Sequence, residues 1–251
     1  RKQKSSQMSQ KHNNGADFLL AQIFATGVVV SIIQAAFSFQ NVTDALGFYG
    51  VYHRDPVNQA IHFFGVPALV WSALLFFAHL PLPWVFSPYI RVPGAPSHRL
   101  TFATVTSIVY AIFYLKIDRI GGFMFSLVIY WMYVSSVRIF VHDQADAKKR
   151  SEHGSVGWKG SGSALKLAAI VQVVGWYVQI HPGHAIFEGA KPALLDGLGQ
   201  ALTSAPLFAF YEGLWFLGIN RELQQLTLKV VKQNTLRLCS EGATMRACAN
   251  L

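Results

Sequence analysis

AIHFFGVPALVWSALLFFAHL, residues 60–80, contains no Asp, Glu, Lys or Arg and is long enough to cross a membrane as a helix. About 20 mainly apolar residues are needed to span the hydrocarbon core of a bilayer. Alternation with a period of two is absent, so strands are not expected. The chain is expected to form an all-α, polytopic membrane helix bundle of about five or six spans. The weakly charged runs place these spans near residues 18–39, 60–80, 100–115, 121–141, 167–187 and 197–219.

The composition of the 251-residue chain also indicates a membrane protein. Hydrophobic residues make up 52% and charged residues only 13% of the sequence, whereas a soluble domain carries about 25% charged residues. The formal net charge is +9, but the basic residues are scattered through short connecting segments. This pattern favours anionic lipid headgroups over nucleic acid as the partner.

The distribution of Lys and Arg predicts an orientation. The first apolar run carries Gln22 and Gln34, so it either crosses the membrane or lies in the interface as an amphipathic helix. With six crossings, one side receives most of the basic residues, and the positive-inside rule places that side in the cytosol. The segments on it are residues 1–17, 81–99, 142–166 and the tail from residue 220.

Two cysteines, Cys239 and Cys248, lie in the polar C-terminal tail. Their spacing fits no common zinc motif, and two thiols make no disulfide framework. No specific role is expected for them.

His62 stands out among the nine histidines because it lies inside an apolar run. Asp55 and Pro56 form a helix start signal, with Asp as the cap and Pro at the first helical position. His62 then falls near the second turn, where polar groups are costly and usually mark a site or a buried partner. Asn58, four residues earlier, lies on the same helical face.

A second polar cluster, QIHPGHAIFEGAKPALLD at residues 179–196, ends a later span. His184 and Glu188 are four residues apart and share a face if this segment is helical. Four crossings, the second to the fifth spans, separate the start of the second span from the end of the fifth, so His53 and His62 are expected at the same membrane surface as His184 and Glu188. Most other histidines, including His79 and His98, are expected to be ordinary surface or interfacial residues.

This set of side chains has a metal-binding and a structural interpretation. Neutral imidazole is the commonest metal-binding side chain, and several imidazoles with a carboxylate suit non-haem Fe(II) or catalytic zinc. Alternatively, the histidines are unrelated, hydrogen-bonded residues that anchor span ends at the interface. Spacing alone leaves both interpretations open.

At these residues the sequence resembles a known family. LGFYGVYHRDPVNQAIHFFGVP, residues 46–67, and GWYVQIHPGHAIFEGAKPALLDGLGQALTSAPLFAFYEGLWFLG, residues 175–218, look like the two signature regions of the Mpo1-like family. The resemblance implies an Fe(II)-dependent dioxygenase in the endoplasmic reticulum membrane. Such an enzyme uses O₂ to shorten long-chain 2-hydroxy fatty acids by one carbon (α-oxidation) during breakdown of the sphingoid base phytosphingosine.

The resemblance also assigns residues. His53, His62 and His184 match the histidines of the family, Glu188 matches its carboxylate, and these four are the expected metal ligands. Glu188 either binds the ion or orients an imidazole that does. Asn58 completes the expected catalytic set as a contact to the substrate carboxylate or to a metal ligand. His181 falls outside the pattern and ranks lower.

The resemblance further divides the chain into three segments. Residues 1–45 form a polar tail plus an extra apolar helix, residues 46–219 the Mpo1-like membrane catalytic domain, and residues 220–251 a polar tail. The acyl chain of the substrate is expected among Phe63, Phe64, Trp71 and aromatic residues of the later spans. A haem-binding membrane protein and a non-enzymatic lipid-binding protein are the alternatives. The several HxxxH and HxxHH boxes of membrane desaturases are absent.

Overall fold

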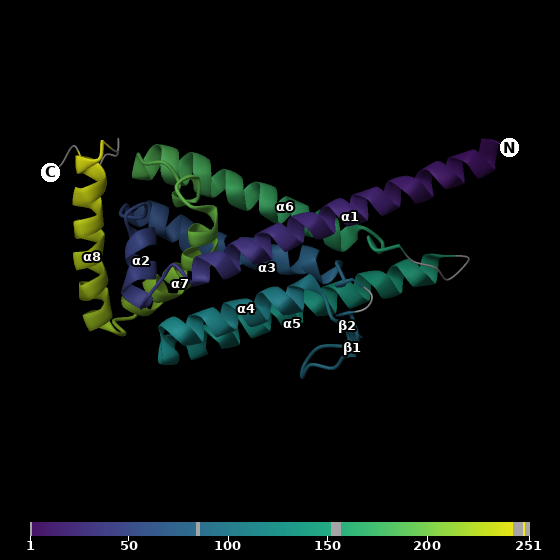
Figure 1. Ribbon diagram of the computed structural model, residues 1–251, viewed down its shortest axis with the longest axis horizontal. Coiled ribbons are helices and arrows are strands. Elements are labelled where there is room, and N and C mark those ends of the chain that lie inside the picture. The colour runs from purple at the N-terminus through teal and green to yellow at the C-terminus, as the bar shows by residue number, and fades with distance from the viewer. Residues whose placement is uncertain (1, 84–85, 152–156, 243–247, 249–251) are drawn as a thin grey trace.

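The computed structural model describes residues 2–83, 86–151, 157–242 and 248, and these are almost entirely helical (Figure 1). The predicted all-α class is therefore confirmed, apart from one hairpin of two short antiparallel strands. The elements are α1 (Lys2–Ala36), α2 (Val42–Gly50), α3 (Pro56–Ala78), β1 (Tyr89–Ile90), β2 (His98–Arg99), α4 (Phe102–Ile117), α5 (Arg119–Arg150), α6 (Ser163–Val178), the π-helix η2 (Gln179–Glu188), the 3-10 turn η3 (Ala193–Leu195), α7 (Leu198–Phe216) and α8 (Arg221–Ser240).

Four helical segments in the described part of the chain are long and apolar enough to cross a membrane, and α4 is a shorter apolar helix. The start of α3 follows the predicted signal, since the Asp55 side chain accepts hydrogen bonds from the backbone N–H groups of Val57 and Asn58. The first apolar run belongs to the long helix α1 and lies along the bundle against α7 and α4. The four segments are Gly15–Ala36, Pro56–Ala78, Arg119–Arg150 and Ser163–Glu188.

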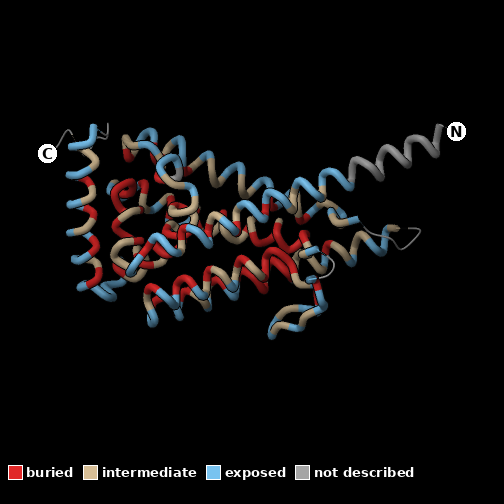
Figure 2. The backbone as a smooth tube through the Cα atoms, in the orientation of Figure 1, coloured by how far each residue is buried: buried red, intermediate tan, exposed pale blue. Residues whose placement is uncertain are grey.

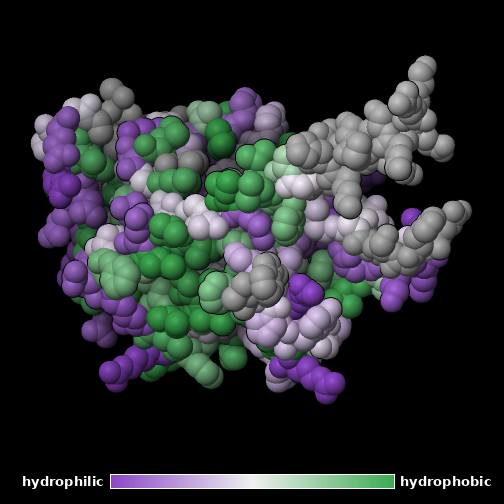
Figure 3. All heavy atoms as spheres, turned by 45° about the vertical axis from the view of Figure 1, so that its right-hand side comes forward, coloured by the Kyte–Doolittle hydropathy of each residue, from purple (hydrophilic) through white to green (hydrophobic). Residues whose placement is uncertain are grey.

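The sides of the bundle are apolar. Only 17% of the most apolar window is buried in α1 and in α6–η2, and Figure 2 shows both segments exposed over much of their length. Their exposed residues include Phe24 and Val173. Figure 3 shows hydrophobic residues gathered over the middle of the face in view and hydrophilic residues toward its edges. An apolar surface of this extent is expected for helices that face lipid.

The predicted sixth crossing, residues 197–219, is wrong: α7 re-enters the bundle instead of crossing it. The chain leaves η2 beside the start of α3, and α7 then begins well inside the bundle, where Tyr110 of α4 donates to the Leu202 carbonyl. It ends at the side it entered from, because Tyr211 bonds to Asp118 at the turn between α4 and α5. Much of its apolar surface, including Leu207, is buried in protein. An uncharged stretch of sequence does not show whether protein or lipid covers the helix, which explains the wrong prediction.

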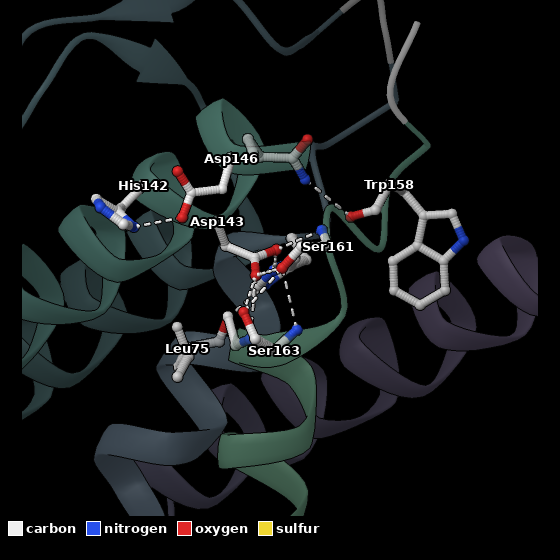
Figure 4. A network of polar contacts seen from close by, with 10 residues as sticks. Leu75, His142, Asp143, Asp146, Trp158, Ser161 and Ser163 are labelled. Atoms are coloured by element: carbon white, nitrogen blue, oxygen red, sulfur yellow. Dashed lines mark hydrogen bonds and ion pairs between the residues drawn. The ribbon is translucent and has the colours of Figure 1, made fainter. Parts of the chain in front are cut away.

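The connection between α5 and α6 is held by Asp143, as Figure 4 shows. Gly162, the N-cap of α6, offers no side chain to the helix. The Asp143 carboxylate of α5 instead accepts hydrogen bonds from the backbone N–H groups of Ser161 (2.9 Å) and Ala164 (3.2 Å), and from the Ser163 hydroxyl. One helix thus caps the next, which satisfies N–H groups that a helix start otherwise leaves unpaired.

The C-terminal helix α8 lies at the opposite end of the bundle from the α5–α6 connection (Figure 1). It packs on α2, and Val230 lies directly against Gly47. Leu223 and Val231 join the core that also contains Ala25 of α1. The prediction that segment 142–166 and the C-terminal tail share one side is therefore wrong, because α7 does not supply the sixth crossing.

Cys239 at the end of α8 forms a disulfide with Cys248. The expectation that the two cysteines have no specific role is therefore wrong. A single disulfide that closes a short loop needs no larger set of cysteines, so the presence of only two cysteines did not exclude it.

Candidate metal centre

Three histidines from separate parts of the chain meet at one point near the α8 end of the bundle. His53 lies in the loop before α3, His62 in the second turn of α3 and His184 in η2. One ring nitrogen from each lies within 4.8 Å of the others, and the ring centroids are 4.3–4.9 Å apart. The convergence predicted from the number of crossings is confirmed.

The histidine rings are held so that each presents a nitrogen to the shared point. The Nδ1 atoms of His53 and His62 lie 3.0 and 2.9 Å from the carbonyl oxygens of Tyr49 and Asn58. Donation through Nδ1 leaves the lone pair of a neutral imidazole on Nε2. The His53 ring also stacks on Tyr49, with centroids 3.8 Å apart.

Unpaired buried nitrogens show that the residues fit a metal ion. His53 Nε2 and His184 Nδ1 are buried and have no hydrogen-bond partner among the described residues. Leaving such atoms unpaired is costly, and buried polar groups are nearly always satisfied. Three imidazoles around one point form a donor set that suits a first-row transition metal with an open position.

The protonation of His53 supports the same conclusion. Burial, reinforced by the neighbouring His62 and His184, holds the pKa of His53 well below its ordinary value. The ring is therefore neutral at neutral pH. Neutral imidazole is the form that binds a metal.

Glu188 contacts the backbone of the loop that carries His53. Its carboxylate accepts hydrogen bonds of 3.0 Å from the backbone N–H groups of Arg54 and Asp55 and from the Asn58 side-chain amide. The group of ligand atoms within 4.8 Å comprises the three histidines and not Glu188. In this arrangement Glu188 ties the end of η2 to the start of α3.

Asn58 joins the two histidine-bearing segments. It is fully buried, and its side-chain amide also reaches the Tyr52 carbonyl at 3.4 Å. Its backbone carbonyl is the group that orients His62. Asn58 therefore contacts a candidate ligand and the carboxylate at once.

Gly183 allows η2 to approach α3 this closely. A Cβ atom at this position would lie 2.6 Å from Asn58 Oδ1 and 3.4 Å from His62 Cε1. The π-helical form of η2 is itself rare, and π-helical turns occur frequently at functional sites. The sequence Pro-Gly-His thus places His184 through a close contact and not through helical periodicity alone.

Other histidines lie away from this point. His181 is exposed and stacks on Tyr177, with ring centroids 5.5 Å apart. The expectation that His98 and His79 are surface or interfacial residues is wrong, since both are buried. His98 bonds to the Tyr133 hydroxyl at 2.6 Å, and His79 lies 3.9 Å from Asp143.

Two features near the site were missed by the sequence reasoning. Phe208 of α7 lies against both Tyr49 and His53. Glu212, one turn further on, has both carboxylate oxygens buried without a hydrogen-bond partner among the described residues, and it interacts electrostatically with Glu188. A single acid within an apolar helix is a signal that could have drawn attention to it.

An apolar cavity extends from His62 and His184 into the bundle. Phe63, Phe64 and Trp71, which were expected to contact an acyl chain, do not line it. Phe64 is instead 74% exposed, and the Trp71 indole donates to Ser135. The cavity is lined by the face of α3 that carries His62. Val66 and Val70 follow His62 on this face at intervals of four residues.

Comparison with known proteins shows the family of the chain. Residues 39–214 match a family described as "2-hydroxy-palmitic acid dioxygenase Mpo1-like". The chain belongs to the Mpo1-like family. It is 27% identical over 196 residues to the 2-hydroxy-palmitic acid dioxygenase MPO1 of Saccharomyces cerevisiae, an alignment that covers 77% of this chain and 92% of the yeast protein. No solved structure matches the chain. The family match begins at residue 39, after the end of α1.

Proposed function

We propose that this protein is a dioxygenase of the endoplasmic reticulum membrane that shortens long-chain 2-hydroxy fatty acids by one carbon, with Fe(II) as its cofactor and O₂ as its second substrate. The observation that carries the proposal is the buried trio of His53, His62 and His184. Unpaired nitrogens belong to His53 and His184, and His62 and His184 line one end of an apolar cavity. Membership of the Mpo1-like family and the name of the yeast relative support the substrate class.

In this proposal the three histidines hold the ion. Bound Fe(II) would supply the redox chemistry that lets O₂ react with the 2-hydroxy acid, at coordination positions that the three imidazoles leave open. Tyr49 and Phe208 pack on the His53 ring. These apolar walls exclude water from the ligand nitrogens and keep the ring in place.

We assign Glu188 and Asn58 to positioning the metal ligands. Glu188 fixes the backbone of the His53 loop through the N–H groups of Arg54 and Asp55. Asn58 fixes the His62 ring through its carbonyl. Partners of this kind orient the ligands of a metal site, and their loss typically lowers metal affinity or activity by about 10–100-fold.

Metal content and turnover together test the proposal. The three single variants His53→Ala, His62→Ala and His184→Ala would be purified anaerobically beside His181→Ala, which changes an exposed histidine of the same segment. Iron and zinc per protein would be measured, together with conversion of 2-hydroxypalmitate to the acid one carbon shorter. We expect iron and activity to fall together in the first three variants and to remain in the fourth. Wild-type iron and turnover in all of them would refute the metal assignment, and zinc in place of iron would refute the cofactor.

A further inference from the structure

Among the described residues that line the apolar cavity, the one with a buried polar atom that lacks a partner lies at the histidine end. His62 and His184 line that end, and His184 Nδ1 is unpaired among the described residues. The polar side chains elsewhere in the lining are engaged with protein. Tyr110 donates to the Leu202 carbonyl, Thr106 to the Phe102 carbonyl and Gln172 to the Leu69 carbonyl. The cavity therefore suits a molecule with a polar head and a long apolar tail.

The cavity is long enough for an acyl chain. Its lining follows α3 from His62 to Phe77, a distance of about 22 Å at 1.5 Å per residue. The hydrocarbon layer of one membrane leaflet is about 15 Å thick, half of the full core. Phe77 is only 3% exposed and packs on Phe102, so the far end is closed.

Lipid can reach the cavity from the side. Its lining combines Val28 and Ile32 of α1 with Trp176 and Ile180 of α6 and η2. Of these residues, Ile180 is 42% exposed, and only 17% of the most apolar window is buried in each of the two segments that form this wall, α1 and α6–η2. The cavity thus opens on an apolar side of the bundle, where a membrane-dissolved substrate already resides. The α1 part of this wall precedes the family match, which begins at residue 39.

We propose that this cavity binds the acyl chain of the substrate and that the residues at its closed end, Ala73 and Phe77, set the longest chain that the enzyme accepts. The inference rests on the proposed function, because it assumes that the carboxyl end of the substrate lies at the histidines. Ala73 is about 16 Å from His62 along α3. A larger side chain there shortens the space available to the tail, and a smaller one at Phe77 lengthens it.

The test compares two alanines of the same helix. Ala73 lines the cavity, whereas Ala68 does not, and both are half-buried. Ala73→Phe, Ala68→Phe and Phe77→Ala would be assayed with saturated 2-hydroxy acids of roughly 8 to 20 carbons, the range that a cavity of this length distinguishes. Binding of the matching fatty acids without the 2-hydroxyl would be followed on iron-free protein by thermal stabilisation. This second readout does not depend on turnover.

Ala73→Phe is expected to weaken binding and turnover of the longest acids by about tenfold or more, the usual effect of overpacking a filled space, while the shortest acids are unaffected. Phe77→Ala is expected to extend the profile to longer chains, and Ala68→Phe to keep the wild-type profile. Identical chain-length profiles for Ala73→Phe and Ala68→Phe, in binding as well as turnover, would overturn the inference. If binding shifts as expected but no protein turns over 2-hydroxy acids, the proposed function fails and the acyl-chain site stands.

Discussion

Replacing Glu188 with alanine distinguishes a residue that positions the metal ligands from one that binds the ion. The change removes the acceptor of three donors: the backbone N–H groups of Arg54 and Asp55 and the side-chain amide of Asn58. Asn58 is fully buried, and an unsatisfied buried donor costs about 1–3 kcal/mol. Water can reach the other two donors, so each loses only the net value of a hydrogen bond, about 1 kcal/mol.

The sum predicts that Glu188→Ala lowers the free energy of unfolding by about 4 kcal/mol. Because the loop that carries His53 is released, iron affinity should also fall, by about 10–100-fold. Denaturant unfolding of the iron-free protein in detergent micelles measures the first effect, and iron titration measures the second. Glu241→Ala is the matched control. Its carboxylate is 56% exposed and pairs with Arg237, so its removal should change stability by no more than about 0.5 kcal/mol.

The two readouts give opposite patterns for the two roles. A positioning residue lowers the stability of the iron-free protein, since its hydrogen bonds exist without the ion. A ligand that served only the metal would abolish iron binding and leave the iron-free protein as stable as wild type. That second result would refute the reasoning. Glu188→Gln, which keeps one acceptor oxygen, should fall between Glu188→Ala and wild type in both measurements.

Three further predictions follow from other parts of the molecule. Gly183→Ala should lower iron content at matched expression, because the added methyl would lie 2.6 Å from Asn58 Oδ1. Gly27→Ala should leave iron content unchanged, because nothing lies within 4 Å of an added methyl there, and equal iron content in the two variants would contradict the close-approach argument. Asp143→Ala should destabilise the protein by about 2 kcal/mol, the upper value for a lost helix cap, while iron content is unchanged because Asp143 lies at the other end of the bundle; loss of iron without loss of stability would be inconsistent with a capping role. Of two glycosylation sites, one inserted near Lys159 and one after Ser240, only one should be modified, because the α5–α6 connection and α8 lie at opposite ends of the bundle. Modification of both sites would disprove the five-crossing arrangement.

The meeting of the histidines could be predicted because it depends only on the number of crossings between His62 and His184, and the structure has the predicted crossings in this part of the chain. His62 lies near the start of α3 and His184 near the end of η2, and the four helical segments α3, α4, α5 and α6–η2 between these points run back and forth along the bundle (Figure 1). Long uncharged runs give these helices directly. The helix start at Asp55 and Pro56 could also be predicted from the sequence, because the capping interaction joins residues that are close together in the chain.

The contacts that complete the site could not be predicted in this way, because they join residues far apart in the chain. Glu188 binds backbone N–H groups 133 and 134 residues away, and a backbone donor carries no mark in the sequence. Gly183 is required only because Asn58 happens to lie opposite it. The Asp143 cap of α6 replaces a side chain that Gly162 lacks, so the sequence next to that helix start contains no signal for its cap.

The orientation of the protein depends on one helix, α7, more than on the total number of basic residues. If residues 197–219 crossed the membrane, Lys148 and Lys159 would share a side with Lys229 and Lys232 of α8, and the positive-inside rule would give a strong answer. Because α7 re-enters instead, these lysines are divided between the two ends, and the charge difference between the ends shrinks. The disulfide of Cys239 then becomes informative, since such bonds persist mainly in oxidising compartments. It favours α8 outside the cytosol, and with it the end of the bundle where His53, His62 and His184 meet. This orientation predicts that the α5–α6 connection lies on the cytosolic side.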